Sequence, residues 1–161
     1  MEKKNIDWGS LGFGYIKTDY RYVANYKNGA WDEGGLTTDD MVTISECAGV
    51  LQYAQTVFEG LKAYTTEDGR IVTFRPDLND ERLENSARRL EIPVFPKERF
   101  VDAVVEVVKA NSAFVPPYGS GASLYLRHRA TIHREPTTRA TECSFFGNRD
   151  GIPDFLCNFA A

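Results

Sequence analysis

The chain has 161 residues, of which 42% are hydrophobic and 26% are charged, and its formal net charge is −4. This composition is typical of a folded globular protein rather than a disordered one, and the acidic balance argues against nucleic-acid binding through clustered lysines and arginines. No apolar run reaches the roughly 18 residues that a membrane span needs, and the polar residues 1–5 lack a signal-peptide core. We therefore expect a cytoplasmic protein that binds neither membrane nor nucleic acid.

Residues 1–18 are expected to form an extended arm, because their glycines and scattered aromatics match neither a helix nor a phosphate-binding loop. The next stretch, Tyr20 to Lys27, is aromatic and β-branched and is followed by Asn28-Gly29 and then Ala30-Trp31. Asn-Gly is the preferred pair of a two-residue type I′ turn, so this region predicts a β-hairpin.

The stretch from Leu51 to Gly60 is ambiguous between helix and strand. Its apolar residues recur at a spacing that fits a short helix ending at Gly60, and they are Leu51, Ala54, Val57 and Phe58. Residues 61–64 and 71–74 flank a polar turn and predict a second hairpin.

Two helices are predicted next. Pro76 and Asp77 suit the first turn of a helix that ends before Pro93. Its apolar stripe is Leu83, Ala87 and Leu90, with Arg82, Ser86 and Arg89 on a different face. The second helix spans 97–114, with an apolar stripe of Val101, Val104, Val105 and Val108.

Residues 122–127 predict a strand with alternating faces, so the strands are neighbours in sequence and are mixed with helices. This order indicates an α+β domain with an antiparallel sheet over residues 19–127. From His128 the character changes: residues 128–161 show no sustained period and contain no lysine. His128 and His133 stand in no regular element, and Cys47, Cys143 and Cys157 lack CxxC spacing, so no metal site or disulfide framework is expected.

Three motifs carry a family resemblance: Tyr53 with Phe58-Glu59-Gly60, the run Asn79-Asp80-Glu81-Arg82, and Ser123 to Arg127. In this order they resemble the N-terminal half of a branched-chain amino-acid aminotransferase, a class IV enzyme that uses pyridoxal 5′-phosphate. The resemblance implies the small N-terminal domain of the D-amino-acid-aminotransferase-like fold. It stops at Arg127, where the family continues with a proline and a linker into a larger domain. We therefore expect residues 128–161 to be an aberrant tail, produced by truncation or by a shifted reading frame.

The resemblance also implies roles for particular residues. Arg82 matches the arginine that binds the cofactor phosphate, and a guanidinium suits a dianion. Tyr53 and Phe58 match positions that line the pocket for a branched aliphatic side chain, while Tyr125 and Arg127 match positions that shape the substrate pocket. On pattern alone, a helical arginine is more often solvated and aromatics at this spacing are more often core.

The parent reaction moves an amino group between leucine, isoleucine or valine and 2-oxoglutarate. It needs a lysine that bonds to the cofactor's aldehyde, and in the family this lysine lies in the second domain. The last lysine here is Lys109, and Lys62 matches a structural position. No catalytic residue is assigned, and the chain is expected to be inactive and not to retain the cofactor. The alternatives are a non-catalytic association module, including a homodimer, and a relative that acts on D-amino acids or aminodeoxychorismate.

Overall fold

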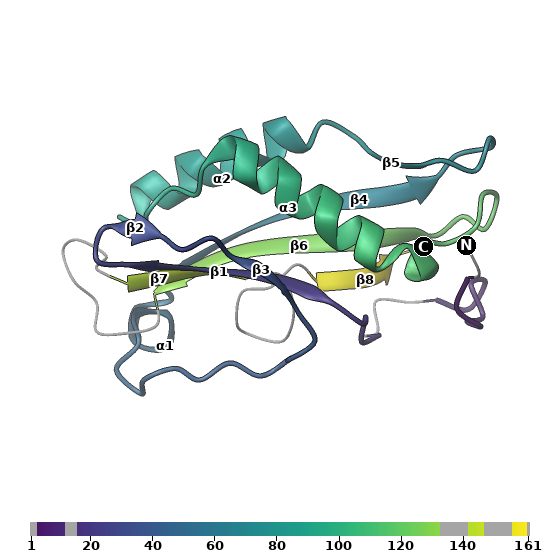
Figure 1. Ribbon diagram of the computed structural model, residues 1–161. Helices are drawn as coiled ribbons and strands as arrows, with labels where there is room; N and C mark the ends of the chain where they lie inside the picture. Colours follow the sequence, from purple (N-terminus) through teal and green to yellow (C-terminus); the bar gives the residue numbers. More distant parts are fainter. Residues whose placement is uncertain (1–2, 12–15, 133–141, 147–155, 161) are drawn as a thin grey trace.

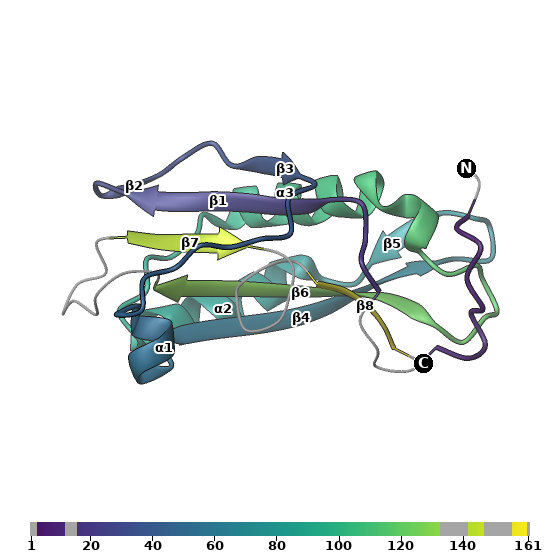
Figure 2. The same cartoon turned by 90° about the horizontal axis from the view of Figure 1, so that it is seen from below.

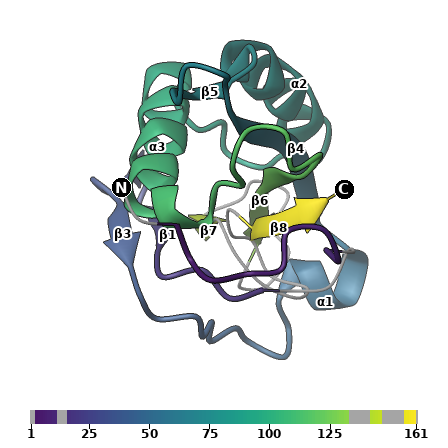
Figure 3. The same ribbon diagram turned by 90° about the vertical axis from the view of Figure 1, so that its right-hand side faces the viewer.

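The computed structural model describes residues 3–11, 16–132, 142–146 and 156–160, the last two ranges by their backbone. An antiparallel sheet is covered on one face by two helices, and a short helix lies on the other side (Figures 1 and 3). The elements are β1 Arg21–Lys27, β2 Ala30–Trp31, β3 Gly35–Thr37, α1 Gly49–Tyr53, β4 Thr56–Thr65, β5 Ile71–Thr73, α2 Pro76–Arg89, α3 Lys97–Ala110, the 3₁₀ helix η1 Ser112–Phe114, β6 Ser123–Ile132, β7 Glu142–Phe146 and β8 Leu156–Ala160. The predicted α+β class with an antiparallel sheet is confirmed.

The sheet order is β2-β1-β7-β6-β4-β5, with β3 paired to β1 and β8 paired to β6. Its central ladder joins β4 and β6 from Thr56 opposite Thr131 to Ala63 opposite Leu124. Figure 2 shows the two long strands side by side, with the hairpin strand β5 beyond β4. Because alternate residues of a strand point to opposite faces, this register decides which side chains meet α2 and α3.

The hydrophobic core lies between the sheet and the helices α2 and α3. The largest fully buried apolar side chains come from α3, β6 and the segment after η1, and they are Phe100, Val104, Val107, Val115, Leu124, Leu126 and Ile132. Burial of such side chains stabilises the fold by about 1.5–3 kcal/mol each relative to exposure. The sheet and the helix pair therefore depend on each other for stability.

Both predicted hairpins are present. Asn28 and Gly29 have φ values of +52° and +86°, as a type I′ turn requires at both central positions. β4 and β5 pair through Tyr64 opposite Val72, and their turn contains Gly69 at φ +81°.

The stretch from Leu51 to Gly60, whose sequence is ambiguous between helix and strand, contains both: the helix does not run through Phe58 to Gly60. Helix α1 ends at Tyr53, and Ala54 turns the chain with a φ of +51°. Strand β4 then runs without interruption through Gly60. A short apolar run fits the period of a helix as well as that of a strand. Pairing with β6 selects the strand, and the β-branched and aromatic residues after Gln55 favour that structure.

The two predicted helices exist, but their buried faces differ in detail from the prediction. In α2, Leu83 and Ala87 are buried as expected, whereas Leu90 lies just after the last helical residue and is exposed. In α3, Val104 and Val108 are buried but Val105 is exposed. The buried face is rotated toward Phe100, Ala103 and Val107, because the aromatic ring of Phe100 fits the core. The helix also ends at Ala110, earlier than predicted.

Strand β6 does not end at Arg127, the last residue before the expected tail. It continues to Ile132, and His128, Thr131 and Ile132 are buried. The first residues of the expected tail are therefore part of the central strand. His133, Cys143 and Cys157 lie outside the residues whose side chains the structure describes.

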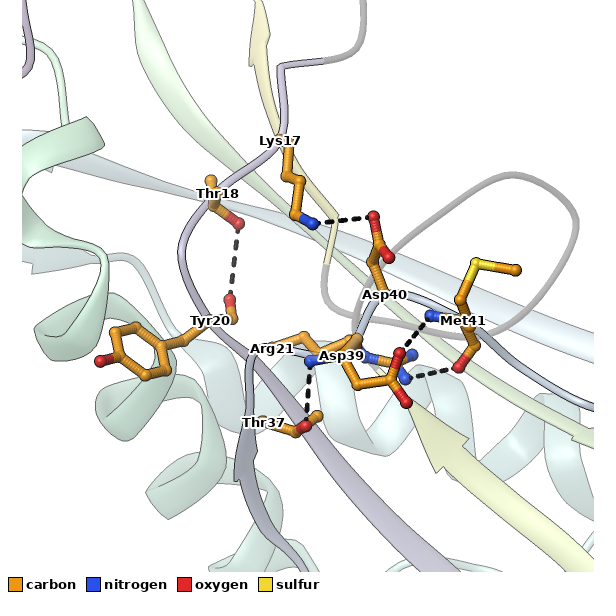
Figure 4. A network of polar contacts seen from close by, with 8 residues as sticks. All are labelled: Lys17, Thr18, Tyr20, Arg21, Thr37, Asp39, Asp40 and Met41. Carbon is orange, nitrogen blue, oxygen red and sulfur yellow. Dashed lines mark hydrogen bonds and ion pairs between the residues drawn. The ribbon is translucent and has the colours of Figure 1, made fainter.

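A buried arginine fixes the loop that follows β3 (Figure 4). Arg21, on β1, donates to the carbonyl oxygen of Asp39 and, through Nη2, to that of Met41 at 2.9 Å. The Asp39 carboxylate accepts from the Met41 backbone N–H at 2.9 Å, and Lys17 pairs with Asp40 at 3.0 Å. These contacts hold the loop and residues 16–18 against β1, so the chain reaches α1 along a defined path.

Candidate functional site

The face of the sheet opposite α2 and α3, which we call the open face, carries most of the predicted substrate residues. In the β4–β6 register, Gly60 lies opposite Arg127 and Lys62 lies opposite Tyr125. Their neighbours Leu61 and Leu126 are buried toward the helices, so these residues point the other way. Phe58 shares the open face and is opposite Arg129.

Tyr125 and Arg127 form a compact group over Gly60. A Cβ atom at Gly60 would lie 1.9 Å from the Tyr125 hydroxyl oxygen, so the tyrosine ring occupies the space that glycine leaves. The Arg127 guanidinium carbon is 5.7 Å from the Tyr125 ring centroid, within the range of a cation–π contact. Arg127 Nε is buried and has no hydrogen-bond partner among the described residues. This group combines an aromatic surface with a positive charge.

The two exposed aromatics of the predicted site are placed differently. Phe58 is 66% exposed on the open face, and Tyr53 is 72% exposed at the end of α1. α1 lies on the open side of the sheet, where Gly49 abuts Ile132 at the far end of β6 from Tyr125. At about 3.3 Å per residue, that end is roughly 20 Å from Tyr125. Tyr53 therefore lies on the same side of the sheet as the open face, but it is separate from the group over Gly60.

Arg82 lies on the other side of the sheet, on α2. Its Nη2 is 2.5 Å from Glu59 Oε2, and the side chain is 60% exposed while that of Glu59 is 17% exposed. Asn79 Nδ2 donates to Glu59 Oε2 at 3.0 Å and to the Gly60 carbonyl oxygen at 2.9 Å. Glu59 and Asn79 thus orient Arg82 and tie α2 to the strand at Gly60.

Sequence reasoning gave no role to Glu59 or Asn79, although both belong to the motifs that carry the resemblance. Their positions hold a usable signal: Asn79 precedes Arg82 by three residues, which places both on one side of a helix. Glu59 adjoins Gly60, where a strand carboxylate and a helix arginine meet. The contacts of Glu59 and Asn79 position Arg82, and the sequence motifs alone do not reveal this role.

The edge of β4 that faces away from β6 lies between the open face and the side of the sheet that carries Arg82. β5 pairs only with Ala63 to Thr65 of β4, so within the described residues Thr56 to Lys62 have a strand partner only on the β6 side. α2 packs beside this edge and brings Arg82 next to Glu59. A ligand that spans the edge could therefore contact both Arg82 and the open face.

Two buried titratable groups belong to the core rather than to this site. Asp80 and His128 line a cavity of about 10 Å³ between α2 and β6, about the space of one water. Burial, reinforced by Glu84, raises the pKa of Asp80 to about 6, and burial lowers the pKa of His128 well below its usual value. His128 also meets Phe100 edge to face, with ring centroids 5.2 Å apart. Burial therefore shifts both groups toward their neutral forms.

Two further properties concern the described residues alone. No group of three or more histidine, cysteine, aspartate or glutamate residues in that part of the chain is arranged to hold a metal ion. None of the helices in the described ranges is long and apolar enough to cross a membrane.

The solved structures that this chain resembles define the class of its fold as that of aminotransferases. The branched-chain amino acid aminotransferase of Escherichia coli superposes with a TM-score of 0.59 at 21% identity, covering 83% of this chain and 40% of that one. The branched-chain aminotransferase of Thermoproteus uzoniensis, solved with norvaline, gives a TM-score of 0.55 at 24% identity, covering 80% of this chain and 40% of its own. No family model matches the sequence.

Relatives found by sequence are more similar to this chain than these solved structures are. A branched-chain-amino-acid aminotransferase of Haemophilus influenzae is 56% identical over 124 residues, which are 77% of this chain and 36% of that protein. The enzyme of that name from Helicobacter pylori is 50% identical over 124 residues, with the same coverage, and the methionine aminotransferase BCAT4 of Arabidopsis thaliana is 45% identical, covering 76% of this chain and 35% of its own. The matched part of this chain is homologous to branched-chain aminotransferases. The chain spans about a third of the length of these relatives.

Proposed function

We propose that the open face around Phe58, Tyr125 and Arg127 forms one wall of the substrate site of a branched-chain transaminase. The observation that carries the proposal is the β4–β6 register, which places these residues on one face of the sheet. Aromatic surfaces bind an aliphatic side chain by excluding water. Arg127, with its buried Nε lacking a described partner, offers a positive charge to a substrate carboxylate.

Arg82 is proposed to bind the phosphate of pyridoxal 5′-phosphate across the edge of β4. The ion pair with Glu59 involves one terminal nitrogen, and a guanidinium has further N–H donors for a dianion. Because Glu59 and Asn79 are largely buried, they hold Arg82 in one direction. These residues therefore fit the phosphate end of the cofactor. When bound, the cofactor supplies the aldehyde and the electron-withdrawing ring that carry the amino group.

These 161 residues by themselves are not expected to transaminate, because none of their lysines is assigned to bond with the cofactor. Lys62 shares the open face with Tyr125, but its position matches a structural one and it is not proposed as a substitute. The purified chain with added cofactor should show no lysine-dependent visible absorption band and no turnover of leucine. A band that disappears in Lys62→Met, together with turnover, would overturn this part of the proposal.

A chimera tests the substrate-site proposal directly. The 124 matched residues of this chain replace their counterparts in the Haemophilus influenzae enzyme, and leucine–2-oxoglutarate transamination is measured. We expect an active chimera in which Arg82→Ala weakens cofactor binding and Arg127→Ala raises the KM for leucine. Arg88→Ala is the matched control, since Arg88 lies on the same helix and pairs with Glu84. A chimera that folds but shows no transamination would refute the proposal.

The exposed apolar side chains favour a second candidate, an association module derived from the same fold. On α1, on β4 and in the preceding loop, large apolar residues are more than half exposed, namely Met41, Leu51, Tyr53 and Phe58. Large apolar side chains that are exposed to solvent promote association when a partner covers them. Size-exclusion chromatography of the chain alone, and mixed with an intact homologue, separates a monomer from a homodimer and from a subunit that captures the homologue.

A further inference from the structure

A groove lies between β5 and the C-terminal half of α3, away from the open face. Its volume is about 240 Å³, and it is lined by Ile71, Val72, Thr73, Val105, Val108, Lys109 and Ser112. The register of the β4–β5 hairpin places Thr73 opposite the buried Ala63. Ile71 and Thr73 therefore point to the helix-covered side. The groove shares no residue with the transaminase site proposed above.

The lining of the groove is mostly aliphatic and includes one charged residue, Lys109. Ile71, Val105 and Val108 form the apolar surface. Lys109 lines the same groove next to Ser112. Lys3 from the N-terminal arm donates through Nζ to the Ser112 carbonyl oxygen at 3.2 Å, and burial lowers the pKa of Lys3. Lys109 is therefore the cationic residue that lines the aliphatic cleft, and Lys3 contacts the backbone of its neighbour Ser112.

We propose that this groove is a binding site for a small aliphatic monocarboxylate. The aliphatic walls accept a short hydrocarbon chain of roughly four to six carbons, a size that a concave site of this kind encloses. Lys109 selects a carboxylate over an alcohol or an amine of the same length, because its ammonium group attracts an anion and repels a cation. The hydroxyl group of Thr73, which lines the same groove, provides a further donor for a carboxylate oxygen.

The test measures binding of three probes of equal length to the full chain: hexanoate, hexan-1-ol and hexylamine. Each probe is titrated, and binding is monitored by ligand-observed NMR and by ¹H–¹⁵N spectra of the protein. We expect saturable hexanoate binding with shifts at Ile71, Val105 and Ser112. Hexylamine should bind at least about tenfold more weakly, because the charge contact then changes from attraction to repulsion. Equal binding of the acid and the amine would overturn the proposal.

Variants locate the site. Lys109→Met should weaken hexanoate about fivefold or more while leaving hexan-1-ol unchanged, and Lys109→Arg should keep most of the affinity. Val105→Asp places a carboxylate on the exposed part of the wall and should abolish hexanoate binding. Lys27→Met, on the exposed end of β1, is the matched control and should change nothing.

Arg127→Met distinguishes this groove from the open face. If the inference is correct, this variant keeps the hexanoate-induced shifts at Ile71, Val105 and Ser112, whether or not the chimera transaminates. Loss of binding in Arg127→Met, with no effect of Lys109→Met, would show that hexanoate occupies the open face and would overturn the inference. Circular dichroism of each variant excludes loss of fold as the cause.

Discussion

The two faces of the central strand pair differ in what their side chains do. Along β4 and β6, Leu61, Leu124 and Leu126 point toward α2 and α3 and are buried. The residues between them, such as Phe58, Tyr125 and Arg127, point to the open face. One register therefore separates the core from the candidate site. A substitution can remove a function without touching the core, and a shift by one residue would exchange the two faces.

The open face is also unlike an ordinary solvated sheet face. An antiparallel sheet that packs helices on one side usually carries polar residues on the other. Here the other side carries an exposed phenylalanine, a tyrosine ring over a glycine, and a guanidinium whose buried Nε has no hydrogen-bond partner among the described residues. This chemistry suits a surface that is covered by a ligand or a partner when it works.

The two faces should differ most in how much a substitution lowers the stability of the fold. Leu126→Ala removes a fully buried side chain from the covered face and should lower the free energy of unfolding by about 2–5 kcal/mol. Phe58→Ala removes a side chain that is 66% exposed and should cost less than about 1 kcal/mol. Urea denaturation followed by circular dichroism measures both. Equal losses would contradict the assignment of the two faces.

The next largest effect on the free energy of unfolding is expected at the close contact between Gly60 and Tyr125. Gly60→Ala adds a methyl group where the Tyr125 hydroxyl lies, so the ring must move, at a cost of about 1–3 kcal/mol. In the Tyr125→Ala background the same substitution should cost much less. The double-mutant cycle on unfolding free energies reports this coupling, and additive effects would show that the ring does not lie over the glycine.

Asp80 on the covered face should make stability depend on pH. Its pKa is about 6 in the fold, against 3.8 in the unfolded chain, so the folded state binds more protons between these values. Stability from this group is therefore present below about pH 4 and is lost as the pH rises through about 6. Asp80→Asn should raise stability at pH 7 by on the order of 1–2 kcal/mol and flatten the profile. Thermal unfolding across pH 4–7 tests this, with Asp102→Asn on the exposed face of α3 as a control. An unchanged profile would contradict it.

The smallest stability effect is expected at Arg82. Its ion pair with Glu59 is more than half exposed on the arginine side, and Asn79 also bonds to Glu59, so Arg82→Ala should cost less than about 1 kcal/mol. In the chimera, however, the same substitution should weaken cofactor binding by about tenfold or more. A large loss of stability with unchanged cofactor affinity would give Arg82 a structural role instead.

The residues alone predicted much of the local structure. The Asn28-Gly29 turn, the β4–β5 hairpin and the start of α2 at Pro76 follow from turn geometry and helix capping, which depend on a few neighbouring residues. The resemblance also named the motifs that hold Arg82 and Tyr125. It could not predict that Glu59 orients Arg82, since that contact joins two elements.

Tertiary structure decided the rest. The apolar residues between 56 and 60 fit both the period of a helix and that of a strand. Only pairing with β6 makes this segment a strand. His128 reads as the first residue of an irregular tail, yet the same strand buries it against Phe100. Faces, registers and burial depend on which segments meet across the sheet, and local sequence preferences do not contain that information.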